Sequence, residues 1–204
     1  MRKRRCGGLR RGLGLYNLKT AESSAETRLP WCNAVGQGFC RGGEFIMDII
    51  KTSELFAKKE YAKHDEIHQW DHIEDVMNVA LKLTKFYSKV DLEILKLAII
   101  FHDISYEQYE THVEESIKVA KKFFKEQDYP EDKTKKVLQV MISHSGPHRK
   151  KFGEAKSIEE KIIYDSDKLH LAKTKEGFEK YHDKFYLDET RDLLRESCPE
   201  FFPL

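Results

Sequence analysis

His102 and Asp103 stand side by side at the end of a strongly apolar run, Ile94-Leu95-Lys96-Leu97-Ala98-Ile99-Ile100-Phe101. An imidazole and a carboxylate at the end of a buried helix are cut off from water, so each needs a partner that stabilises it there. A divalent metal ion can serve both, because imidazole nitrogens and carboxylate oxygens are common ligands of such ions. The pair therefore indicates a metal site at the end of this helix.

Three other residues of metal-ligand type lie on the inner face or at the end of expected helices: His72, His144 and Asp167. His72 begins an apolar stripe at helical spacing, which continues with Val76, Val79, Leu83 and Phe86. His144 follows Val137 by seven residues, and Asp167 follows Ile163 by four. Each histidine taken alone is more often a core residue held by a hydrogen bond, so the case for a metal depends on the whole set.

The order His, His-Asp, His, Asp resembles that of the HD superfamily of metal-dependent phosphohydrolases. The matching segments are His72-Ile73-Glu74-Asp75-Val76, Ala98-Ile99-Ile100-Phe101-His102-Asp103-Ile104 and Asp165-Ser166-Asp167-Lys168-Leu169. The resemblance extends over roughly residues 60–185. It implies a metal ion held by His72, His102, Asp103 and Asp167.

His112 resembles the third histidine of the two-metal members of this superfamily. Together with His144 it would complete a second metal site in which Asp103 bridges two ions. A histidine in the first turn of a helix is also often an exposed surface residue, so the sequence leaves open whether one ion or two are bound. Mixed nitrogen and oxygen ligands favour Mn, Fe, Co, Ni or Zn over Ca, without selecting among them.

The resemblance implies hydrolysis of a phosphate ester, with a nucleotide as the favoured substrate. A bound metal ion would lower the pKa of water from about 15.7 towards about 7. Asp103 or Asp165 could then accept or relay the proton, while Lys168 and Arg149 offset negative charge on the phosphoryl group. Arg149, His148 and Lys168 are the candidate substrate-binding residues.

Two other functions remain open. The ligand order with His112 and His144 also resembles the di-iron oxygenases of the same superfamily, although the nearby cationic residues favour phosphate chemistry. A non-catalytic nucleotide sensor is the second alternative, and the intact set of ligands argues against it.

The elements that must position these residues are helices. Candidate helices beyond Met47 span about residues 48–62, 67–88, 91–103, 111–127, 130–144, 157–171, 174–184 and 188–196. Thr111 with Glu114, and Ser157 with Glu160, have the spacing of capping boxes. No strand-like alternation competes, so we expect one all-α, HD-type bundle of about six to eight helices, with loops at 104–110 and 145–156 beside the site.

Composition excludes several classes of protein. With 40% hydrophobic residues and no apolar run near about 20 residues, the chain of 204 residues is not expected to span a membrane. Residues 1–46 carry nine Lys/Arg against three Glu, a balance of +6, which leaves −5 for residues 47–204 because the whole chain carries +1. A nucleic-acid partner is therefore not expected. The cysteines show no disulfide pattern, which indicates the cytoplasm, and homo-oligomerisation is left open.

Residues 1–46 form a separate segment by composition. They hold eight of the eleven glycines and no hydrophobic period, so we expect this extension to be disordered. The sequence Arg41-Gly42-Gly43-Glu44 can be encoded by a purine-rich stretch that resembles a bacterial ribosome-binding site upstream of Met47. Translation from Met47, which would make the extension non-native, is one interpretation, and an Arg-rich targeting peptide is the other. Residues 47–204 are the expected hydrolase domain.

Overall fold

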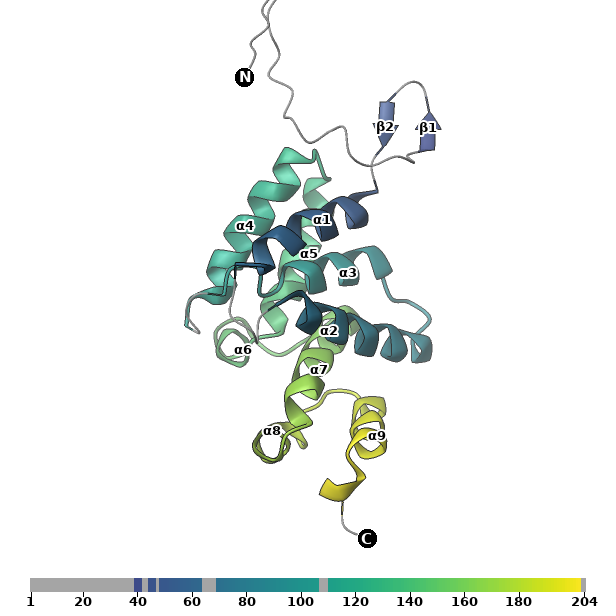
Figure 1. The fold of residues 1–204 in the computed structure, drawn as a ribbon, viewed down its shortest axis with the longest axis vertical. Coiled ribbons are helices and arrows are strands. Elements are labelled where there is room, and N and C mark those ends of the chain that lie inside the picture. Colours follow the sequence, from purple (N-terminus) through teal and green to yellow (C-terminus); the bar gives the residue numbers. More distant parts are fainter. Residues whose placement is uncertain (1–38, 42–43, 47, 64–68, 107–109, 203–204) are drawn as a thin grey trace, which may run out of the picture. The chain divides into compact units, whose positions relative to one another are not determined.

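The computed structural model describes residues 39–41, 44–46, 48–63, 69–106 and 110–202 (Figure 1). The helices among these residues are α1 Ile49–Tyr61, α2 Trp70–Leu83, α3 Leu92–Phe101, α4 His112–Glu126, α5 Glu131–Ser143, α6 Gly146–Phe152, α7 Ile158–Ala172, α8 Lys175–Tyr181 and α9 Asp188–Ser197. A 3₁₀ turn at Thr84–Phe86 follows α2, and another at Pro199–Phe201 follows α9. The predicted all-α domain is confirmed, and no helix among the described residues is long and apolar enough to cross a bilayer.

Helix α3 lies at the centre of the packing. It contacts α1, α2, α4, α5 and α7, and its apolar residues from Ile94 to Phe101 are buried all around the helix, with only Lys96 partly exposed. The Asp91 side chain caps its N-terminus by accepting a hydrogen bond from the Ile94 backbone N–H at 3.2 Å. Because the whole helix is buried, the residues that follow its last turn also lie inside the protein.

Helix α7 brings the other elements of the site together. It packs against α2, α3, α5, α8 and α9 (Figure 1). The Ser157 hydroxyl caps its N-terminus by accepting a hydrogen bond from the Glu160 N–H at 3.2 Å, as predicted. The Glu160 carboxylate accepts from the Lys156 N–H rather than from Ser157, so the capping box is not closed. The prediction of a capping box at Thr111 and Glu114 is wrong, since the Thr111 side chain makes no capping hydrogen bond at the start of α4.

The segment 145–156, expected to be a loop, contains the short helix α6. Pro147 lies in its first turn, where a missing backbone N–H costs nothing because no acceptor is available there. Gly153 follows the helix with a φ of +96°, which ends it.

The apolar stripe that begins at His72 stops sooner than expected. Helix α2 ends at Leu83, and Phe86 in the following 3₁₀ turn is 60% exposed.

Most of the N-terminal extension lies outside the described residues. Its described part is an antiparallel hairpin, not predicted from the sequence, in which β1 Phe39–Arg41 pairs with β2 Glu44–Ile46 and Phe39 lies opposite Ile46. In the sequence the two strands are separated by a Gly-Gly pair, which is common between hairpin strands.

A chain shortened to begin at Met47 is expected to keep the thermal stability and metal content of the full chain. Every residue of the described hydrophobic core lies at Ala57 or beyond, so the truncation removes none of them. Differential scanning calorimetry and metal analysis of the two chains check this. A melting temperature lower by more than about 5 °C would show that the extension contributes to folding.

Candidate metal centre

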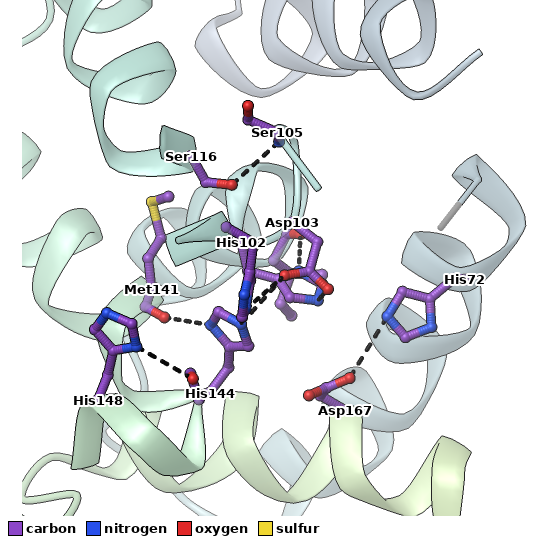
Figure 2. Close-up of polar contacts among 12 residues, drawn as sticks. His72, His102, Asp103, Ser105, Ser116, Met141, His144, His148 and Asp167 are labelled. Atoms are coloured by element: carbon purple, nitrogen blue, oxygen red, sulfur yellow. Dashed lines mark hydrogen bonds and ion pairs between the residues drawn. The ribbon is translucent and has the colours of Figure 1, made fainter. Parts of the chain in front are cut away.

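The six candidate ligands are brought together from five helices. Figure 2 labels five of them, all except His112. His72 lies in the first turn of α2, His102 and Asp103 follow α3, His112 begins α4, His144 follows α5, and Asp167 lies in α7. All six are buried, with exposures between 0 and 9%. The alternative that His112 is an exposed surface residue is therefore excluded.

The ligand atoms form two groups of three. His72, His102 and Asp167 each offer one nitrogen or oxygen within 4.8 Å of the others, and so do Asp103, His112 and His144. Each group has the size and composition of a site for a divalent ion. The resemblance implied that Asp103 belongs to the first site and bridges to a second ion where one is bound, and in the structure Asp103 groups with His112 and His144 while it also lies beside His102.

Asp103 directs one carboxylate oxygen towards each group (Figure 2). Its Oδ2 lies 3.5 Å from Nε2 of His102. Its Oδ1 lies 3.2 Å from Nε2 of His144 and 3.5 Å from Nε2 of His112. This is the arrangement expected of a carboxylate that bridges two ions.

Two of the imidazole rings are fixed by backbone carbonyls. Nδ1 of His102 donates to the Ile99 carbonyl at 2.8 Å, and Nδ1 of His144 donates to the Met141 carbonyl at 2.5 Å. A carbonyl can only accept, so the proton of each neutral ring is on Nδ1 and the lone pair is on Nε2. Both rings therefore direct an unprotonated nitrogen into the site, as a metal ligand must.

The residues present fit a metal ion, because buried polar atoms lack a partner where the ion would lie. Nε2 of His102 and Oδ1 of Asp103 are both buried without a hydrogen bond. An unpaired buried polar atom costs about 1–3 kcal/mol, and more when it is charged. A cation at each group would remove this cost, one coordinated by Nε2 of His102 and the other by Oδ1 of Asp103.

The protonation states also suit a cation. Burial lowers the pKa of His102 to about 4, against the opposing charge of Asp103, so this imidazole is neutral near pH 7. Burial opposes ionisation of Asp103, but His102 and His144 hold its pKa well below the usual range. For Asp167 the opposing effect of burial is outweighed by Lys168 and His72, which lower its pKa. His102 is thus neutral and the two carboxylates are ionised. Burial opposes protonation of His72, but the hydrogen bond to Asp167 raises its pKa, so His72 must release its proton before it can bind a metal ion.

A cavity of about 680 Å³ opens over the two groups, a size that suits a small-molecule ligand. Its lining includes five of the six ligands, His102 being the exception. The other charged or aromatic lining residues are Tyr106, Arg149, Lys150, Glu154, Tyr164, Lys168, His170, Lys180, Tyr181 and Lys184. The wall of the cavity is thus predominantly basic.

Lys168 and Arg149, two of the predicted substrate-binding residues, line this cavity. The Lys168 ammonium pairs with Oδ2 of Asp167, and this contact raises its pKa despite the opposing effect of burial. The Arg149 guanidinium packs on the Tyr164 ring, 3.8 Å from its centroid, and donates to the Tyr186 hydroxyl at 2.7 Å. Both cations are therefore held in place beside the candidate metal ligands.

His148, the third predicted substrate-binding residue, does not line the cavity. It lies in α6 and is buried against α4. Its Nε2 is 2.9 Å from the Glu114 carboxylate, and its Nδ1 is 3.2 Å from the Ser145 hydroxyl. Its contacts join the two helices that follow His112 and His144. We therefore no longer assign it to substrate binding.

Asp165, a predicted proton acceptor, faces away from the cavity. It lies two residues before Asp167 on α7, about 200° around the helix. Its carboxylate accepts hydrogen bonds from the backbone N–H groups of Tyr186 and Leu187, at 2.9 and 2.8 Å, and from the Thr190 hydroxyl at 2.8 Å. Burial raises its pKa to about 6, against these hydrogen bonds. Its role is to hold the start of α9 against α7.

Replacing Asp165 with alanine is expected to lower the free energy of unfolding by about 2–4 kcal/mol, because three buried donors lose their acceptor. Metal content per folded chain should stay that of the wild type. Urea denaturation and metal analysis of the soluble protein check both expectations. Loss of metal with unchanged stability would return Asp165 to the site.

Sequence reasoning missed several residues of the cavity wall, His170, Lys180, Tyr181 and Lys184 among them. His170 lies three residues after Asp167 on the same face of α7, and its Nδ1 is 3.3 Å from the Asp75 carboxylate, so helical spacing could have found it. Lys180, Tyr181 and Lys184 come from the end of α8 and the residues after it. Nothing in the sequence distinguishes these two lysines from ordinary surface charge.

Comparison with known proteins agrees with this geometry. The sequence pattern of the HD domain matches residues 70–172, half of the chain, and this segment contains all six ligands. The chain therefore belongs to the HD-domain family, a superfamily of metal-dependent phosphohydrolases. A crystal structure of the Lin1889 protein from Listeria innocua shares the fold, with a TM-score of 0.52 and 20% identity over 76% of this chain and 91% of that one. No curated protein matches the sequence.

Proposed function

We propose that the protein is a metal-dependent phosphohydrolase that releases phosphate or pyrophosphate from a nucleotide or another small phosphate ester. The observation that carries this proposal is the arrangement of Asp103 between two His/carboxylate groups, at the floor of a cavity with a basic wall. Two neighbouring metal groups and positive charge together suit an ester with a negatively charged leaving group.

A divalent ion bound at either group would supply a water of lowered pKa, near 7, and an electron-withdrawing contact to a phosphoryl oxygen. The chain's own residues supply the remaining steps. Lys168 is held by Asp167 at the edge of the first group, where its ammonium can bind a phosphoryl oxygen and offset charge that develops there. Arg149, fixed by its contact with Tyr164, can bind a second oxygen of the same anion.

Asp103 serves in this proposal as a ligand rather than as a strong base. A carboxylate whose pKa lies well below the usual range takes up protons poorly near pH 7. It can still orient the attacking water by accepting a hydrogen bond from it. Two half-buried tyrosines of the wall, Tyr106 and Tyr181, offer aromatic surface on which a nucleotide base can stack.

Metal analysis after anaerobic purification tests this function against its main alternative. We expect one or two divalent ions per chain, together with metal-dependent phosphate release from a panel of nucleotides and phosphomonoesters. Two iron ions with an oxygen-dependent absorption spectrum, and no phosphate release, would identify an oxygenase instead. A protein that binds nucleotides with its metal in place but hydrolyses none would be a sensor.

A further inference from the structure

Tyr61, the last residue of α1, reaches the end of the central helix α3. Its side chain is fully buried. Its hydroxyl donates a hydrogen bond to the Ile100 carbonyl at 3.2 Å. Ile100 lies in the last turn of α3, three residues before Asp103. A hydroxyl from α1 therefore lies beside the backbone that leads into His102 and Asp103.

The Tyr61 hydroxyl also contacts Asp103 itself. Burial and the charge of Asp103 raise the pKa of this hydroxyl well above its usual range, against a hydrogen bond with the Asp103 backbone. The hydroxyl therefore keeps its proton near pH 7 and can donate it to the Ile100 carbonyl. Because a phenol oxygen can also accept a hydrogen bond, one side chain can hold backbone groups on both sides of His102.

The end of α3 needs partners of this kind, because the last carbonyls of a helix have no donor within the helix. Here the end is buried, so water does not replace a missing donor. The Ile99 carbonyl accepts from Nδ1 of His102, which belongs to the site. The Ile100 carbonyl accepts from Tyr61, which comes from another helix. Tyr61 therefore ties the turn that carries the ligands to a part of the protein outside the site.

The Tyr61 ring also contacts the start of α2. It packs edge-on against the Trp70 ring, with the two centroids 6.2 Å apart. Trp70 begins α2, two residues before His72. Tyr61 thus contacts both the start of the helix that carries His72 and the end of the helix that leads to Asp103.

The direction of the Asp103 carboxylate depends on the backbone that Tyr61 holds. An aspartate has a short side chain, so its oxygens move with its Cα atom. Asp103 must direct Oδ2 towards His102 and Oδ1 towards His112 and His144 at the same time. Outer contacts that orient metal ligands commonly change metal affinity by about 10- to 100-fold.

We propose that Tyr61 is a positioning residue of the metal centre, whose hydroxyl fixes the backbone at the end of α3 and thereby the direction of the Asp103 carboxylate. This inference rests on the metal-dependent function proposed above. Tyr61 lies before residues 70–172, the segment that matches the HD domain, so the family match does not account for it.

A Tyr61→Phe variant tests this role, because it removes the hydroxyl and keeps the ring that packs on Trp70. Metal-free protein is titrated with Co²⁺, whose visible absorption reports the geometry of its ligands. We expect Tyr61→Phe to bind Co²⁺ at least about tenfold more weakly than the wild type, with a changed absorption spectrum. The melting temperature of each metal-free protein is measured beside the titration.

Tyr129→Phe is the matched control, because it removes the same group from a contact at the other end of α3. The Tyr129 hydroxyl donates to the Glu93 carboxylate at 2.7 Å, in the first turn of α3. Glu93 lies about 10 Å along the helix from Ile100, and neither Tyr129 nor Glu93 lines the cavity. We expect Tyr129→Phe to lower the melting temperature and to change the Co²⁺ affinity less than about twofold.

Wild-type Co²⁺ affinity and absorption in Tyr61→Phe would overturn the role of Tyr61. So would an equal loss of affinity in the two variants, because it would show a general effect of stability.

These results are distinct from a failure of the proposed function. A protein that hydrolyses no phosphate ester can still bind Co²⁺ and show the difference between the two variants. A protein that hydrolyses phosphate esters, and whose Tyr61→Phe variant binds Co²⁺ like the wild type, has the metal chemistry without this role of Tyr61. A wild-type protein that binds no Co²⁺ would overturn the metal centre and this inference together.

Discussion

Replacing Asp103 with alanine is expected to remove the metal from both groups and to reduce phosphate release by at least about 10³-fold. The reason is that the Asp103 carboxylate lies between the two groups. Its Oδ2 is on the side of His102, and its Oδ1 is on the side of His112 and His144. Removal of this carboxylate would take one ligand from each ion and the single negative charge that the two ions share. Metal analysis by mass spectrometry and a phosphate-release assay measure the two effects.

The Asp103 variant should keep the far-UV circular dichroism of the helical fold, because the change removes a buried charge without removing any residue of the apolar core. His182→Ala is a suitable control, since His182 is exposed and does not line the cavity. An Asp103 variant that retains both metal and turnover would show that the metal centre has been assigned to the wrong residues.

Replacing His112 with alanine is expected to lower the metal content from about two ions to about one, and the rate by more than about a hundredfold. The second group would keep only Asp103 and His144, too few ligands to hold an ion tightly. The group of His72, His102 and Asp167 loses nothing and should keep its ion. Stoichiometry from metal analysis, combined with kcat and KM, separates the loss of one ion from a general loss of folding.

A wild-type protein that binds a single ion at saturation, with His112→Ala unchanged in metal content and rate, would contradict the two-ion arrangement. The burial of His112 would then have a structural explanation, and the enzyme would work with one ion. Loss of both ions in His112→Ala would instead show that the two groups bind metal cooperatively through Asp103.

The fold was largely predictable because its hydrophobic pattern is simple. The run that ends at His102 had to be buried on all sides, and α3 is the helix at the centre of the packing. Helix α6 could not be predicted, since a seven-residue helix that begins with Gly-Pro has no apolar stripe. Its existence depends on the contacts of the surrounding helices rather than on its own sequence.

Most of the candidate metal ligands were predictable for a related reason. His102, Asp103 and His144 follow helices with buried apolar residues, and His72 begins an apolar stripe, so their burial follows from that of their neighbours. Asp167 lies within α7 and His112 begins α4, and both were assigned by their resemblance to ligands of the family.

The roles of Asp165 and His148 could not be predicted. Asp165 lies two residues before Asp167 and so on the other side of α7, and His148 lies in α6, a separate helix after His144. Lys180 and Lys184 could not be recognised either, since they reach the cavity wall through the packing of α8 on α7.

Metal reconstitution tests the central claim most directly. Protein stripped of metal with a chelator is titrated with Mn²⁺, Fe²⁺, Co²⁺, Ni²⁺ or Zn²⁺, and phosphate release is measured against the number of ions bound per chain. We predict no release from the stripped protein, and release that rises as the sites fill and levels off at about two ions per chain. Phosphate release that is the same in stripped and loaded protein, or a wild-type chain that binds none of these ions, would contradict the account.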